Sequence, residues 1–207
     1  MIRFLTISLL LTLLLTSCGT YKYPTSSGIR SIAPKEVNTY YADTAQAYVY
    51  RTRLTAFQKE INGNLVVKSI SPETHRLALL SDFGQTLFDI SVFSDTYVVH
   101  YAMADLNKKK VVKEVASLFR LLTSRRFATE ALIFPTQQYF PVYVANGDYY
   151  TYEERNLVEI KHVKGSKERF SVRFSDVQDA LPQQIDIKHK RYPLSLSLQL
   201  DSAQSEL

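Results

Sequence analysis

Among the side chains able to do chemistry, the first is a single thiol close to the start of the chain, at Cys18. A mostly apolar run, Phe4 to Leu15, precedes it, and Arg3 is the only charged side chain before that run. The 12 residues of the run match the core of a signal peptide and are too few to cross a hydrocarbon layer of ~30 Å. The pattern predicts a signal peptide over residues 1–17, with a retained membrane helix as the alternative.

The four residues that end this segment resemble the lipobox of bacterial lipoproteins: Leu15, Thr16, Ser17 and Cys18. Attachment of a diacylglyceryl group needs a thiol at the last position, so we expect Cys18 to be the lipid-modified first residue of the mature protein. An ordinary secretory signal followed by a chance cysteine is the alternative. Two acyl chains on sulfur and a third on the new amino terminus would bury tens of methylenes at about 0.8 kcal/mol each, which makes a permanent anchor. No cofactor is expected beyond this covalent lipid.

The remaining reactive side chains form no catalytic or metal-binding pattern. The four histidines are far apart in the sequence: His75, His100, His162 and His189. None lies in a metal-binding frame, so no metal site is predicted. The adjacent Glu153 and Glu154 favour a solvated strand end over an acid–base pair. With no Gly-x-Ser-x-Gly elbow and no glycine-rich phosphate loop, the sequence predicts a protein that is not an enzyme.

The charge distribution is mildly basic, with a formal net charge of +5 for the 207 residues. Lysine and arginine are scattered among acidic residues, which argues against a nucleic-acid partner. The cluster Lys108 to Lys110 is expected to face water, with contact to lipid phosphates as the alternative. Fourteen tyrosines and eleven phenylalanines favour a β-rich protein.

The residues after position 47 alternate with a period of two and are punctuated by turn signals. They predict a mainly β (α+β) fold, a curved antiparallel sheet or open half-barrel of about 9–11 strands. Residues 18–46 have no sustained period and are expected to be a lipidated tether, so the folded domain would span 47–207. The expected turns are 62–64, 71–73, 81–84, 146–148 and 164–166.

One helix is predicted over 106–123, where apolar side chains recur at three- and four-residue steps. Asp105 or Asn107 is expected to cap its start. Its wide apolar stripe needs a partner, and the concave face of the sheet is the one available.

Parts of this pattern resemble the outer-membrane lipoprotein receptor LolB, of the LolA/LolB family, and LolB-like lipoproteins of the Bacteroidota. The resemblance covers roughly 47–125 and is carried by the lipobox, the strand pattern, the segment Phe83 to Asp89 and the segment Leu106 to Lys109. The strands that follow match by pattern alone. The chain departs from LolB after the helix, where Arg125 to Glu130 and Pro135 stand in place of a segment that contains proline and tryptophan. The resemblance therefore predicts neither the geometry of a lid nor the identity of the cargo.

The resemblance implies an open barrel with a helical lid and an apolar cavity for the acyl chains of lipoproteins. It implies a protruding loop, here Phe83 and Gly84, that enters the membrane; Phe83 packed into the core is the alternative. The partners implied are membrane lipid, acyl chains of lipoproteins and a periplasmic LolA-like carrier, and we expect a monomer. The candidate cavity residues on the inward strand faces and the helix are Leu79, Phe88, Ile90, Val115, Phe119 and Leu122.

These observations lead to a first hypothesis: a lipid-anchored protein of the outer membrane that binds acyl chains and assists lipoprotein or lipid delivery. The absence of acidic residues from Gly19 to Lys22 favours the periplasmic face over the cell surface. The second hypothesis is a structural or interaction lipoprotein of an envelope assembly with a fully packed barrel. A third is an enzyme acting on envelope lipid or glycan, which two convergent carboxylates in a cleft would support.

Overall fold

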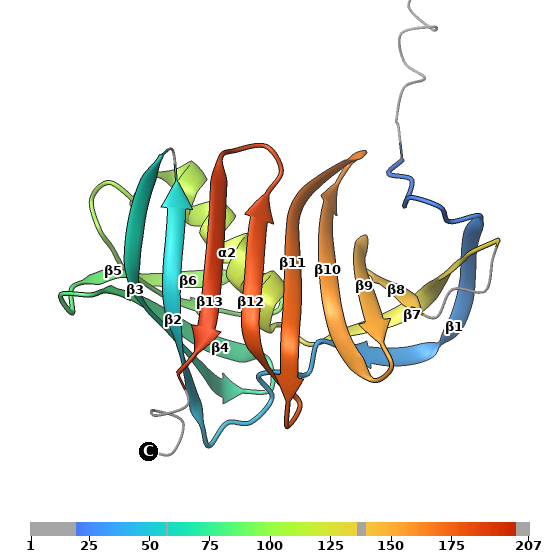
Figure 1. The fold of residues 1–207 in the computed structure, drawn as a ribbon, viewed down its shortest axis with the longest axis horizontal. Helices are drawn as coiled ribbons and strands as arrows, with labels where there is room; N and C mark the ends of the chain where they lie inside the picture. Colours follow the sequence, from blue (N-terminus) through green and yellow to red (C-terminus); the bar gives the residue numbers. More distant parts are fainter. Residues whose placement is uncertain (1–19, 57, 136–139, 202–207) are drawn as a thin grey trace, which may run out of the picture.

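The computed structural model describes residues 20–56, 58–135 and 140–201, which form one open antiparallel sheet and one helix (Figure 1). The sheet has 13 strands in the order β1-β7-β8-β9-β10-β11-β12-β13-β2-β3-β4-β5-β6. The predicted fold class is therefore confirmed, with more strands than expected. The strands are β1 (Gly28–Val37), β2 (Ala47–Ala56), β3 (Lys59–Ser71), β4 (Thr74–Ser81), β5 (Thr86–Val92), β6 (Tyr97–Ala102), β7 (Arg126–Ile133), β8 (Val142–Ala145), β9 (Asp148–Glu153), β10 (Asn156–Lys164), β11 (Lys167–Gln178), β12 (Leu181–His189) and β13 (Leu194–Leu200).

The connection between β6 and β7 explains why the helix lies across the sheet. β6 is one edge of the sheet and β7 is next to the other edge, so the chain between them must cross the concave face. That crossing segment is α2 (Lys109–Thr123), which Figure 1 shows behind β2, β13 and β12. Its Phe119 ring meets the Phe88 ring of β5 edge to face, at 6.5 Å between centroids. Among the described residues, no helix is both long and apolar enough to span a bilayer.

Of two turns predicted from Asn-Gly pairs, one is a hairpin turn and the other is not. Asn146 and Gly147 have φ values of 53° and 80°, the left-handed pair that a two-residue type I′ turn requires. They join β8 to β9 as expected. The predicted turn at 62–64 is wrong, because Gly63 lies inside β3, paired with Thr52 on one side and Ser81 on the other.

The segment expected to be a tether is folded for most of its length. β1 pairs with β7 along the sheet edge, and Tyr41 is buried in the main core. On the opposite face of the sheet, Tyr21 and Tyr23 pack on Tyr149, with ring centroids 5.4 and 5.1 Å away. The 18–46 boundary is therefore corrected: the folded part extends at least to Tyr21. The sequence hid this because a polar edge strand shows no apolar alternation.

Helix α2 is shorter at its start than predicted, and neither expected residue caps it. The cap position is Lys108, which makes no side-chain hydrogen bond there. The other end is held by a residue distant in sequence: Asn38 Nδ2 donates to the carbonyl oxygens of Leu121 and Leu122 at 3.0 Å and of Ser124 at 3.3 Å. These are carbonyls that a helix leaves without partners. The buried amide thereby ties the segment after β1 to the end of the helix.

Candidate functional site

A groove of about 440 Å³ lies between the first half of α2 and one end of the sheet. This volume falls within the usual range of small-molecule sites. The sheet contributes the start of β11, the end of β12 and the turn into β13, and Figure 1 shows the β12–β13 turn at the upper edge of the molecule. The lining residues are Lys110, Val111, Lys113, Glu114, Val115, Leu118, Arg169, Phe170, His189, Arg191, Tyr192 and Leu194.

The groove combines an apolar floor with a basic rim. Leu118 and Phe170 are buried, and Val111, Val115 and Leu194 are half-buried, so hydrocarbon side chains form its inner surface. The cationic side chains at the rim are Lys110, Lys113 and Arg191, all of them exposed, and the half-buried Arg169. Glu114 is the single carboxylate in the lining. An amphiphile with a hydrocarbon chain and a negatively charged end matches both properties.

The imidazole of His189 has a fixed hydrogen-bonding role at this groove. Its Nδ1 accepts hydrogen bonds from the backbone N–H groups of Arg191 at 2.9 Å and Tyr192 at 3.0 Å. A nitrogen that accepts two N–H bonds carries no proton, so in the neutral ring the hydrogen is on Nε2. This Nε2 is buried and has no hydrogen-bond partner among the described residues.

The surroundings of His189, burial above all, favour its neutral form. Burial lowers the pKa of the imidazole, and this outweighs Glu114, whose carboxylate raises it; Arg169 and Arg191 lower it further. Glu114 Oε2 lies 3.7 Å from Nε2, beyond hydrogen-bond distance, while Oε1 accepts a bond of 2.9 Å from Arg169. The buried Nε2–H of His189 is therefore within ion-pair distance of the Glu114 carboxylate but makes no hydrogen bond with the described residues.

The candidate cavity residues are distributed between the packed core and the groove. Val115 lines the groove. The other five belong to the buried cluster between α2 and the sheet: Leu79, Phe88, Ile90, Phe119 and Leu122. The structure thus brings all six together on the concave side, and Val115 also lines the groove.

The loop Asp82-Phe83-Gly84 projects from the end of the β4–β5 hairpin. Gly84 has a φ of 74°, and its N–H donates to the Ser81 carbonyl at 2.9 Å, the arrangement of a tight three-residue hairpin. Asp82 forms an ion pair of 2.6 Å with Arg51 of β2, which fixes the base of the loop. The Phe83 side chain, 92% exposed, is presented to solvent, so the alternative of packing into the core is wrong.

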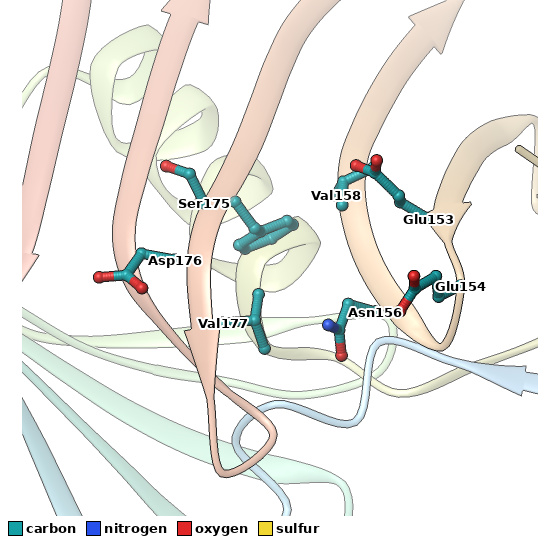
Figure 2. Close-up of a pocket in the computed structure, with 8 residues that line it drawn as sticks. Glu153, Glu154, Asn156, Val158, Ser175, Asp176 and Val177 are labelled. Carbon is teal, nitrogen blue, oxygen red and sulfur yellow. The ribbon is translucent and has the colours of Figure 1, made fainter.

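Acidic residues gather at a second hollow, of about 430 Å³, beside the β9–β10 turn. Figure 2 shows that the carboxylates of Glu153 and Glu154 lie apart, and that Asp176 points away from both. This is a solvated rim without a converging acid–base pair. The described part of the chain also holds no cluster of three or more metal-ligating side chains.

The sequence analysis named the lipobox residues but not the sheet half of the groove. Leu15, Thr16, Ser17 and Cys18 lie outside the described residues, so their processing stays a prediction. The sheet half of the groove was missed, above all Arg169, His189 and Arg191. Its one visible signal was the basic run Lys188 to Arg191 beside a predicted strand.

Comparison with known proteins returned similarities of fold only. No protein-family model and no curated protein matches the chain. Among solved structures, a LolA superfamily protein from Nitrosomonas europaea is 10% identical over 76% of this chain and 84% of its own, with a TM-score of 0.43. A domain named for outer membrane lipoprotein sorting, from Vibrio parahaemolyticus, is 9% identical over 76% and 83%, with a TM-score of 0.35.

Proposed function

We propose that the protein is a non-enzymatic, lipid-anchored outer-membrane lipoprotein that holds an acyl chain in the groove between α2 and the β11–β13 end of the sheet. The observation that carries this proposal is the apolar floor of an open, 440 Å³ groove beside the buried core. Lipoproteins and lipids would be delivered because the bilayer buries an acyl chain more completely than an open groove does.

The proposed acyl-chain site is tested with a substitution that fills the groove with a larger side chain. In the chain from Thr20 to Leu207, which contains every strand and helix α2, Val115→Trp should weaken binding of a fluorescent palmitoylated peptide at least tenfold. The bulky ring would occupy the volume that the acyl chain needs. Val98→Trp is the matched control, because Val98 is exposed on β6, on the opposite face of the sheet. Equal affinity of the two variants, or no binding by the wild type, would contradict the proposal.

The proposed anchor and the β4–β5 loop together define how the domain meets the bilayer. Only Gly19 and Thr20 separate Cys18 from Tyr21, which is packed on the sheet. Three residue steps span at most about 11 Å, so the β7–β9 region would lie close to the membrane. The β4–β5 loop lies near the other end of the strand order, far from β7–β9 (Figure 1). Both can touch the membrane only if the long axis of the sheet lies along it.

Cell fractionation tests the lipid anchor, and a transfer assay with vesicles tests the β4–β5 loop. Cys18→Ser should release the protein from the outer-membrane fraction completely, because no acyl chain can then be attached. Phe83→Asp should leave the protein in the membrane, since its lipid remains, and should slow transfer of a labelled lipoprotein to vesicles about tenfold. Ile70→Asp, at an exposed apolar side chain of β3 beside the β3–β4 turn, lies away from both proposed contacts and should transfer normally. Membrane retention of Cys18→Ser would contradict the anchor, and normal transfer by Phe83→Asp would contradict the loop.

The second candidate function, an accessory subunit of an envelope assembly, is favoured by the packing of five of the six candidate cavity residues in the core. It predicts a stable co-purifying partner and no acyl-chain binding, so the palmitoylated-peptide experiment separates the two functions.

A further inference from the structure

We propose that the ligand of the groove is an acyl lipid with a phosphate headgroup, and that His189 Nε2–H donates a hydrogen bond to one of its oxygens. This inference rests on the proposed function, because it assumes that an acyl chain occupies the groove. It adds the chemistry of the other end of the ligand.

His189 has a buried Nε2–H donor without a hydrogen-bond partner among the described residues, and the Glu114 carboxylate lies 3.7 Å from it. The two backbone N–H groups that bind Nδ1 place the proton of the neutral ring on Nε2 and fix the plane of the imidazole. The His189 side chain is 2% exposed, and Phe170 and Tyr192 pack against its ring, each with centroids 4.7 Å away. A buried donor without a partner is costly. A ligand oxygen in the groove would remove that cost.

Cationic side chains outnumber carboxylates at the rim of the groove. Lys110, Lys113, Arg169 and Arg191 supply four cationic groups around an apolar floor that has one carboxylate. Arg169 is held by Glu114, and Arg191 lies over the Tyr192 ring, 5.4 Å from its centroid. Phosphate oxygens can accept from several such donors at once, and guanidinium groups match their geometry. The ends of the hydrocarbon floor are thus bordered by groups suited to phosphate.

The binding measurement compares lipids that differ only in the headgroup. The chain from Thr20 to Leu207 is titrated with a lysolipid carrying a phosphomonoester, with the matching neutral monoacylglycerol, with the matching fatty acid and with inorganic phosphate. We expect the phosphate lipid to bind at least tenfold tighter than the neutral lipid, and tighter than the fatty acid. Inorganic phosphate, which has no chain to bury, should not compete at millimolar concentration.

Two substitutions at His189 separate the ligand bond from the structural one. His189→Asn keeps an acceptor near the Nδ1 position and removes the Nε2 donor, so it should weaken phosphate-lipid binding about tenfold and leave the neutral lipid unchanged. His189→Gln places its amide N–H donor near the position of the imidazole Nε2. It should therefore retain more affinity for the phosphate lipid than His189→Asn does. Arg191→Gln should lower the preference for phosphate. Lys190→Gln is the charge control, because Lys190 pairs with Glu168 and does not line the groove.

The possible outcomes distinguish the two proposals. Equal binding of the neutral and phosphate lipids, or equal losses for both in His189→Asn, would overturn the phosphate headgroup and leave the acyl-chain groove intact. If the fatty acid bound more tightly than the phosphate lipid, the rim would be assigned to a carboxylate, and the phosphate headgroup would again be overturned. If none of the chain-bearing probes bound, the proposed function itself would fail.

Discussion

Replacing Gly63 with valine should lower the free energy of unfolding by more than about 3 kcal/mol, the largest effect expected from one substitution in this sheet. A Cβ at Gly63 would lie 1.9 Å from the Leu80 carbonyl oxygen. That obstacle is backbone, so no change of rotamer can relieve the clash. β3 would have to move away from β4 and lose ladder hydrogen bonds on that side. Urea denaturation of the chain from Thr20 to Leu207 measures the difference.

A second glycine provides the control for this prediction. Gly147 has a φ of 80° and no atom within 4 Å of the position of an added Cβ. Gly147→Ala therefore introduces backbone strain without a clash and should cost about 1–2 kcal/mol. A Gly63→Val effect no larger than that of Gly147→Ala would show that β3 and β4 can separate freely, contrary to the close approach of Gly63 to the Leu80 carbonyl.

Replacing Asn38 with alanine should destabilise the protein by about 3 kcal/mol and loosen the end of α2. The substitution leaves buried carbonyls at Leu121, Leu122 and Ser124 without their donor. Asn38 also has a φ of 61°, a left-handed conformation that asparagine tolerates better than alanine. Chemical denaturation gives the stability change, and hydrogen exchange in the last turn of α2 reports the local opening.

Glycine at position 38 separates the two causes. Asn38→Gly relieves the left-handed strain but supplies no amide, so it should recover about 1 kcal/mol relative to Asn38→Ala and remain less stable than the wild type. If Asn38→Gly were as stable as the wild type, the three hydrogen bonds would contribute nothing. Because α2 forms one wall of the groove, both variants should also bind the palmitoylated peptide more weakly.

The sequence by itself determined the features that depend on neighbouring residues. Alternation of apolar side chains identified most strands, and the three- and four-residue spacing of the helix identified α2. The left-handed preference of Asn146 and Gly147 was sufficient to place a hairpin. The segment around Phe83 was recognised as a turn between strands, because Gly84 supplies the positive φ that the turn needs. Each of these features depends on residues that are close together in the sequence.

Tertiary structure decided the features in which distant segments meet. The segment 62–64 has the local signal of a turn, yet pairing with β2 and β4 on both sides keeps it extended, and Gly63 serves the close approach of Leu80. β1 has too little apolar alternation to be recognised and is formed by its pairing with β7. Only folding brings Val115, Phe170 and His189 to one groove and leaves Nε2 without a partner. The physical reason is that periodicity reports which face of an element is buried, whereas the partner of that face depends on the path of the whole chain.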